Sequence, residues 1–180
     1  GVGGVGLSAI KMASLLQAYP IIAVDISDDK LDFAKKWGAT HTINSTKTDP
    51  VKQLLEISKY GVDFAFDAVG TKKTHEIILP MVKGGGPGAY NTGGTAVLIG
   101  WPDDTMEMIP RDFLFHQRQY RGSHGAAEPD KDFKMYLRLD SEGKFPLKEL
   151  VTKKYDFADI NQGLDDLKNG KIFGRALVIF

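Results

Sequence analysis

The first six residues are the part of the sequence whose types and spacing most clearly suit a chemical task. Gly1-Val2-Gly3-Gly4-Val5-Gly6 has the G-x-G-x-x-G spacing, in which glycines permit a tight turn, a close approach of the backbone to phosphate, and close packing of the next helix. The free N–H groups at a helix start carry partial positive charge and bind anions without a basic side chain. The spacing therefore predicts a diphosphate-binding turn, although a frayed glycine-rich terminus has the same composition.

A carboxylate follows at the distance that such a turn requires. Asp25 ends the apolar run at residues 21–24, about 20 residues beyond the glycines, where a carboxylate accepts hydrogen bonds from ribose hydroxyls. Asp28 and Asp29 add negative charge nearby and no arginine follows Asp25, so a ribose phosphate would be repelled and NAD is predicted over NADP. Lys30 either donates to the same ribose or lies on a solvated helix face.

Strand and helix patterns alternate along residues 7–123, and they predict the elements that position these groups. Short apolar runs predict strands at residues 21–24, 42–43, 62–69, 95–99 and 119–123. Apolar residues at helical spacing predict helices between them, with Asp28, Asp49-Pro50 and Thr71 or Thr74 as the expected starts. Strands separated by helices need crossover connections, so the predicted fold class is α/β with a doubly wound parallel sheet.

The pattern changes near residue 129. A helix containing Phe133, Tyr136 and Leu137 is followed by a short apolar segment, another helix and a closing strand that begins at Arg175. These elements add no regular repeat of the preceding strand–helix unit. We therefore expect residues 1–128 to form a dinucleotide-binding domain and residues 129–180 to form a C-terminal α/β tail.

Composition narrows the class of partner. The 23 basic and 23 acidic residues balance, so no overall field favours nucleic acid or a membrane surface, and a small-molecule ligand is expected. No run approaches the ~20 apolar residues of a membrane span. The chain has no cysteine and its 4 histidines are scattered without a metal-binding spacing, so no metal site is predicted. The expectation is a cytoplasmic protein.

These segments together resemble the coenzyme-binding domain of the zinc-type medium-chain dehydrogenase and reductase family, which includes alcohol dehydrogenases. The similarity is carried by residues 1–10, 21–31, 38–41, 66–70 and 94–100, and by the closing run 163–180, which is similar to the segment that returns to the catalytic domain. The resemblance implies a Rossmann-like fold and an NAD-dependent oxidoreductase that moves hydride between NAD and an alcohol or carbonyl substrate. Zinc is expected only in a separate N-terminal half.

The resemblance also implies a role for particular residues, with none of them catalytic or metal-binding. Those expected at the pyrophosphate are Gly1, Val2, Gly3, Gly4, Val5, Gly6 and Arg175. Asp25 and Lys30 are expected at the adenosine ribose, with Ala68 and Val69 beside the adenosine. Those expected near the nicotinamide are Ile99, Gly100, Trp101 and Ser123.

The sequence departs from the family in two places. No catalytic domain with cysteine and histidine ligands precedes Gly1, and the strand that should lead into the glycine turn, central in a 3-2-1-4-5-6 sheet, is missing. We therefore expect an incomplete domain, a fragment that is inactive alone. The glycine-rich stretch between Lys83 and Gly94 looks like an insertion.

Other interpretations stay open at this point. A noncatalytic NAD-binding module or a truncated variant has the same turn and carboxylate, and a methyltransferase is a remote alternative. The segment between Ile109 and Ser123 carries Phe113, Leu114, Phe115 and Tyr120 near a predicted sheet edge. Such an edge invites pairing, so a homo-oligomer is expected.

Overall fold

The computed structural model describes residues 1–86, 92–102, 105–125 and 127–180. Its strands are β1 (Ile22–Asp25), β2 (His41–Asn44), β3 (Phe64–Asp67), β4 (Thr95–Leu98), β5 (Gln119–Gly122), β6 (Val151–Asp156) and β7 (Arg175–Ile179). Its α-helices are α1 (Gly4–Leu15), α2 (Asp28–Lys36), α3 (Pro50–Ile57), α4 (Lys72–Met81), α5 (Pro110–Leu114), α6 (Pro129–Ser141), α7 (Leu147–Leu150) and α8 (Ile160–Lys168). A short 3-10 turn, η1 (Phe157–Asp159), precedes α8.

Side-chain caps set where several helices begin. The carboxylate of Asp49 accepts hydrogen bonds from the first amides of α3, and Thr71 forms a reciprocal capping box with Thr74 at the start of α4. Both starts were predicted. The predicted cap of α2 by Asp28 is wrong, because Ser27 accepts the hydrogen bond from the Lys30 amide and Asp28 lies inside the first turn.

The strands form parallel sheets in an order that matches the predicted fold class. β1 pairs with β2, and β3, β4 and β5 pair in sequence, all in parallel. Within the described part of the chain, no ladder joins β1 to β3. A doubly wound sheet without its central strand has this order. The predicted strand at residues 62–69 is shorter than expected, because the structure continues the ladder only through β3, with an isolated bridge at Val62.

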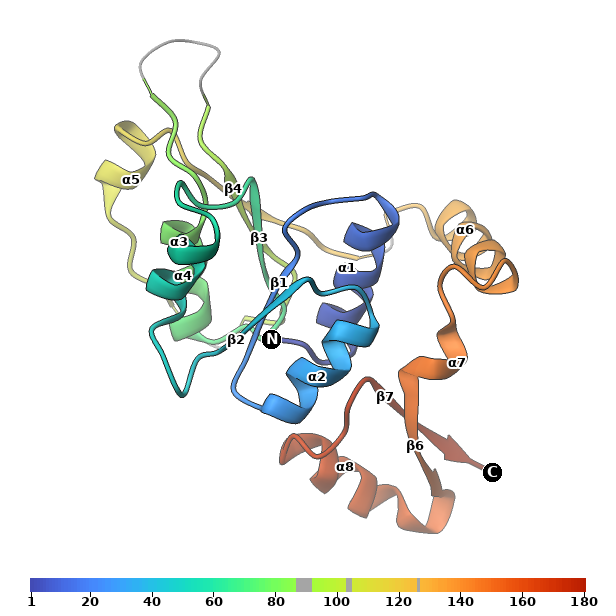
Figure 1. The fold of residues 1–180 in the computed structure, drawn as a ribbon. Coiled ribbons are helices and arrows are strands. Elements are labelled where there is room, and N and C mark those ends of the chain that lie inside the picture. Colours follow the sequence, from blue (N-terminus) through green and yellow to red (C-terminus); the bar gives the residue numbers. More distant parts are fainter. Residues whose placement is uncertain (87–91, 103–104, 126) are drawn as a thin grey trace.

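Two apolar clusters lie on opposite faces of β1. Ala23 belongs to a cluster with Leu7 of α1 and Leu31 of α2, whereas Ile22 packs against a second cluster built around Ile43. Figure 1 shows α1 and α2 (blue) on one side of the strands and α3 and α4 (green) on the other. Burial of alternate strand residues against helices on both faces is what the doubly wound arrangement requires.

The C-terminal elements pack onto the first cluster. Phe145 and Leu150 are buried members of it, and the ring of Phe145 meets that of Trp37 at a centroid distance of 6.0 Å. Beyond α7, β6 and β7 form a separate parallel pair, and they lie with α8 at the lower edge of the molecule (Figure 1). The tail therefore contributes side chains to the core that supports α1. The division of the chain at residue 128 stays a prediction.

The glycine-rich stretch between Lys83 and Gly94 folds partly onto the segment before β5. The Gly85 amide donates to the carbonyl of His116, and the side chain of Gln117 donates to the carbonyl of Gly86. Residues 87–91 of the expected insertion lie outside the described residues. In the part that is described, no helix is both long and apolar enough to cross a bilayer.

Candidate functional site

The glycines of the predicted turn differ in their surroundings. A side-chain carbon at Gly6 would overlap the carbonyl oxygen of Gly1, and one at Gly4 would overlap the guanidinium of Arg175. A carbon at Gly1 would overlap the side chain of Val69. At Gly3, in contrast, no other heavy atom lies within 4 Å of that position. The turn is closed by protein on three sides and open at Gly3.

The open side faces the start of α1. Gly3 is the residue immediately before the helix, with φ −70° and ψ −167°, and its carbonyl accepts the first helical hydrogen bond, from the Leu7 amide at 2.9 Å. The first amides of a helix have no acceptor within the helix and point toward its start. The turn thus presents the free amides of a helix start on its open side, which suits an anion.

Asp25 is joined directly to this turn. Its Oδ2 accepts a hydrogen bond from the Val2 amide at 2.8 Å, and its Oδ1 accepts from the amides of Ile26 and Ser27 at 2.8 and 3.1 Å. A carboxylate offers about four acceptor sites, so one position stays available on this partly exposed side chain. The carboxylate at the end of β1 therefore faces the glycine turn with capacity for one further donor.

Two cations from distant segments lie beside the turn. The guanidinium of Arg175 covers Gly4, and the ammonium of Lys30 lies near Gly170, at the end of α8. Burial lowers the pKa of the Gly1 amino group, which Asp25, Asp67 and Lys30 all influence electrostatically. The tail and α2 thus add positive charge near the turn.

The negative charge predicted at Asp28 is largely neutralised. Its carboxylate accepts from Asn44 at 2.8 Å and pairs with the Lys47 ammonium at 2.5 Å. These contacts, led by the hydrogen bond from Lys47, lower the pKa of Asp28. Asp29, the other acidic residue expected to repel a ribose phosphate, is exposed and takes no part in this pairing.

The loops that follow β3, β4 and β5 meet at the same edge of the sheet. The main-chain oxygen of Asp67 accepts from the amides of Ile99 and Gly100 at 3.0 and 2.8 Å, and the Ser123 amide donates to the carbonyl of Leu98 at 2.8 Å. Trp101 is 80% exposed, and its backbone lies against Gly70, whose φ of 98° favours glycine. The structure brings the predicted residues of these loops together.

A buried polar cluster at this edge was not predicted. Oδ1 of Asp67 accepts from the Val69 amide at 2.8 Å and from the Gly70 amide at 3.3 Å, and Oδ2 accepts from the Thr74 hydroxyl at 3.0 Å. Nδ1 of His75 lies 2.6 Å from the same Oδ2. Both side chains are almost fully buried. The sequence signal was the position of His75, three and four residues before the buried Ile78 and Leu79 on one helix face.

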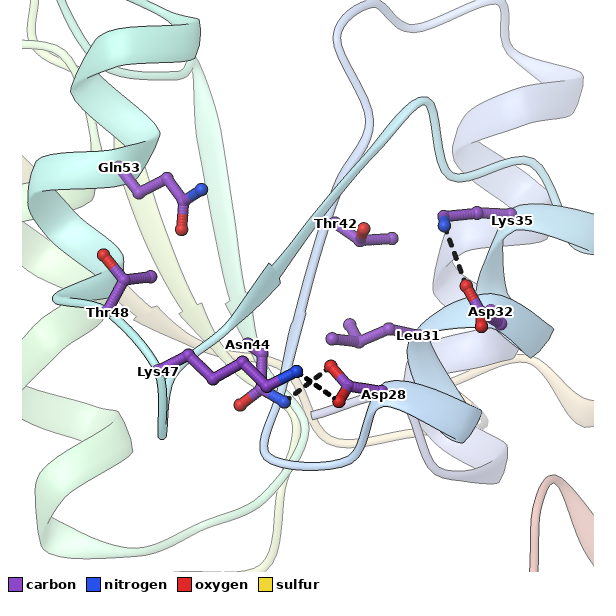
Figure 2. A pocket seen from close by; sticks show the side chains of 9 residues that line it. All are labelled: Asp28, Leu31, Asp32, Lys35, Thr42, Asn44, Lys47, Thr48 and Gln53. Atoms are coloured by element: carbon purple, nitrogen blue, oxygen red, sulfur yellow. Dashed lines mark hydrogen bonds and ion pairs between the residues drawn. The ribbon is translucent and has the colours of Figure 1, made fainter.

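A surface groove lies elsewhere in the described part of the chain. It has a volume of about 420 Å³ and is lined by residues of α2, β2 and the segment leading to α3. Figure 2 shows that its charged groups pair with one another, Asp28 with Lys47 and Asp32 with Lys35. None of the residues predicted for the site line it. An internally paired, polar surface is a weaker candidate for an anionic ligand than the amide-lined turn.

The described residues offer no grouped set of metal ligands. The chain contains no cysteine, and no group of three or more potential ligands occurs among the residues that the structure describes. These residues do not fit the zinc site that the resemblance implies for the other half of such enzymes.

Known proteins resemble this chain over nearly all its length. The model of the family described as zinc-binding dehydrogenase matches residues 4–142. A curated relative from Mycobacterium tuberculosis, provisionally named alcohol dehydrogenase D, is 31% identical over 175 residues, which are 95% of this chain and 46% of that protein. The chain thus spans about half the length of its curated relative.

Solved structures show the same fold. Benzyl alcohol dehydrogenase from Acinetobacter calcoaceticus is 34% identical and superposes with a TM-score of 0.87, over 99% of this chain and 47% of that one. A zinc-binding dehydrogenase from Sinorhizobium meliloti 1021, provisionally assigned and solved bound to NADP, is 21% identical with a TM-score of 0.76, over 99% of this chain and 50% of its own. The second likeness supports the fold alone.

Proposed function

Because the chain belongs to the zinc-binding dehydrogenase family, we propose that it forms the nicotinamide-dinucleotide-binding half of an oxidoreductase acting on an alcohol or carbonyl compound. One observation carries the proposal: the Val2 amide donates to Oδ2 of Asp25 at 2.8 Å. This bond joins the amide-lined turn to the carboxylate that ends the neighbouring strand. A diphosphate bound at the turn and a ribose bound at the carboxylate would then be adjacent parts of the same ligand.

The residues of this chain bind and orient the cofactor. The amides that begin α1 hold the pyrophosphate, with the guanidinium of Arg175 as a second partner. Asp25 accepts from the ribose, and Lys30 donates to it from the start of α2. Ala68 and Val69 flank the adenosine, where Ile26, 70% exposed just beyond Asp25, offers a further apolar surface. The bound cofactor supplies the chemistry, since its nicotinamide ring accepts or gives up hydride.

The loops after β4 and β5 flank the nicotinamide end. Ile99 and Gly100 are fixed by the main chain of Asp67, and Ser123 is fixed by β4, so these backbone groups are held rigidly beside the proposed ring position. Trp101 lies at the rim, where it is exposed and limits access to that position. No step is assigned to zinc here, because the described residues do not fit a zinc site.

We also propose that the preferred cofactor is NAD. Asp25 is a partly exposed carboxylate with two oxygens already held by three amides, so it cannot turn away from an incoming ribose. A phosphate on that ribose would meet its negative charge. The NADP-bound relative is only 21% identical, so its cofactor does not carry over to this chain.

Self-association is a further part of this proposal. Leu114 and Phe115 are 73% and 66% exposed next to β5, whose outer edge is unpaired in the described residues. The predicted contributions of Phe113 and Tyr120 are wrong in one respect, because both pack against the second apolar cluster. An exposed apolar pair beside a free strand edge favours a homo-oligomer.

Calorimetric titration of the chain with NAD, with NADP and with AMP tests the binding proposal. We expect NAD to bind more tightly than NADP by at least about ten-fold, the factor given by 1.4 kcal/mol. Oxidation of alcohols by the longest natural product, followed through NADH absorbance, tests the activity. Binding of NAD without oxidation by that product would favour a noncatalytic module, and no binding of NAD would refute the proposal.

A further inference from the structure

His75 and Asp67 form a buried polar pair that the proposed cofactor contacts do not use. The side chain of His75 is 2% exposed and that of Asp67 is 1% exposed. Burying a polar group costs free energy unless it is hydrogen-bonded, and burying a charge costs more. The neighbouring buried residues on this helix face, Ile78 and Leu79, are apolar. The retained histidine therefore calls for a reason other than packing.

The geometry around Asp67 supplies that reason. Its two oxygens accept from the amides of Val69 and Gly70 and from the hydroxyl of Thr74, and the Gly70 amide reaches both oxygens at 3.3 Å. A carboxylate has about four acceptor sites, and Nδ1 of His75 lies 2.6 Å from Oδ2. That separation is shorter than the ~2.7–2.9 Å of a charge-assisted N–H···O bond and is repulsive without a proton between the atoms. The contact therefore requires a proton on Nδ1, which faces Oδ2 of Asp67.

The alignment of this contact is imperfect. Nδ1 does not meet Oδ2 along the line of a good hydrogen bond, and Nε2 has no hydrogen-bond partner among the described residues. The backbone of His75 is held by hydrogen bonds at both its carbonyl and its amide. The His75 carbonyl accepts from the Tyr120 hydroxyl at 3.0 Å, and the His75 amide donates to Thr71.

Asp67 is the common anchor of the loops at the site. Through its side chain it holds the amides of Val69 and Gly70, and through its main-chain oxygen it holds those of Ile99 and Gly100. The side chain of Val69 in turn lies against Gly1. A shift of the carboxylate would therefore move the surfaces on both sides of the glycine turn.

We propose that His75 is a positioning residue, whose buried Nδ1 contact with Oδ2 of Asp67 fixes the carboxylate and with it the Val69–Gly70 amides beside the dinucleotide. The inference rests on the proposed function for its ligand. It adds a residue of α4 that touches no ligand and acts only through Asp67.

Three variants test this role. His75→Leu keeps most of the volume and removes the donor, whereas His75→Asn restores an N–H at the place of Nδ1. His116→Leu is the matched control, because His116 is exposed. We expect His75→Leu to weaken NAD binding about ten-fold and to accelerate hydrogen exchange at the Val69 and Gly70 amides by a similar factor. The β1–β2 amides should exchange as before, His75→Asn should recover most of both losses, and His116→Leu should change neither.

A measurement on the unaltered chain guards against variants that fail to fold. Nitrogen-15 NMR of the imidazole ring should show Nδ1 protonated, and an unprotonated Nδ1 overturns the inference. Unchanged NAD binding and unchanged exchange in a folded His75→Leu overturn it as well. Failure of the unaltered chain to bind NAD would refute the proposed function separately, because the selective exchange at Val69 and Gly70 is measured without ligand.

Discussion

Adding one methyl group at Gly3 should separate ligand binding from folding. The backbone at Gly3, with φ −70° and ψ −167°, lies in the extended region that any residue adopts, and a side-chain carbon there meets no heavy atom within 4 Å. Gly3→Ala should therefore lower the free energy of unfolding by less than ~1 kcal/mol, the cost of alanine at a helix cap. The methyl group points to the open side of the turn, where the diphosphate would approach.

The binding cost follows from the same geometry. Inserting a methyl group into a filled contact costs about 1–3 kcal/mol, which corresponds to a loss of roughly 5-fold to 150-fold in NAD affinity. Gly6→Ala is the matched comparison, because its new carbon overlaps the carbonyl of Gly1. In the absence of ligand, the free energy of unfolding of that variant should be lower than that of the unaltered chain by at least ~1–3 kcal/mol.

Urea denaturation and calorimetric titration measure the two quantities. We expect Gly3→Ala to unfold at nearly the same urea concentration as the unaltered chain while binding NAD more weakly. The reasoning is refuted if Gly3→Ala binds NAD as tightly as the unaltered chain, or if Gly6→Ala is as stable as Gly3→Ala.

Three further changes have defined outcomes. Asp25→Asn should weaken NAD binding by about 1.5–3 kcal/mol, the value of a hydrogen bond to a charged group, while Asp29→Asn leaves the titration unchanged; equal effects would contradict the role of Asp25. Hydrogen bonds from Tyr155, then Lys153 and Lys171, hold the pKa of Asp166 below its usual value of 3.8. Stability from this group is present above pH 3.8 and falls as the pH drops toward the folded pKa, so acid should lower the melting temperature less in Asp166→Asn. Burial, with a smaller effect of Asp67, raises the pKa of Tyr120 from 10.0 to about 12. This contribution is intact below pH 10 and lost as the pH rises through 12. Burial also raises the pKa of Tyr155, so ultraviolet titration should show a late tyrosine near pH 12 that Tyr120→Phe removes.

Local sequence chemistry predicted the parts of the site that depend on neighbouring residues. A glycine turn, a carboxylate ending an apolar run and the Asp49-Pro50 helix start each depend on a few adjacent residues, and the structure has all three. The alternation of strands and helices was sufficient for the parallel, two-faced sheet, because crossover connections leave few other arrangements. The start of α2 was misassigned since serine and aspartate are both good caps. Asp28 instead bonds to Asn44 and Lys47.

Contacts that depend on how helices and strands pack could not be predicted from the sequence. Asp67 and His75 are eight positions apart and meet only because α4 folds back along β3. Phe113 and Tyr120 belong to an apolar segment, but which of its side chains face the core depends on how α5 and β5 pack. The apolar segment is too short for its periodicity to identify which face is buried.

The central claim is that a dinucleotide lies on the amide-lined turn with its ribose at Asp25. Titration of the nitrogen-15-labelled chain with NAD, followed by amide NMR shifts, tests it most directly. The account predicts the largest shifts at the amides of Gly3, Gly4, Val5 and Gly6, together with those bonded to Asp25. Saturable shifts confined to the groove at Asp28 and Lys47, with the turn unmoved, would contradict it.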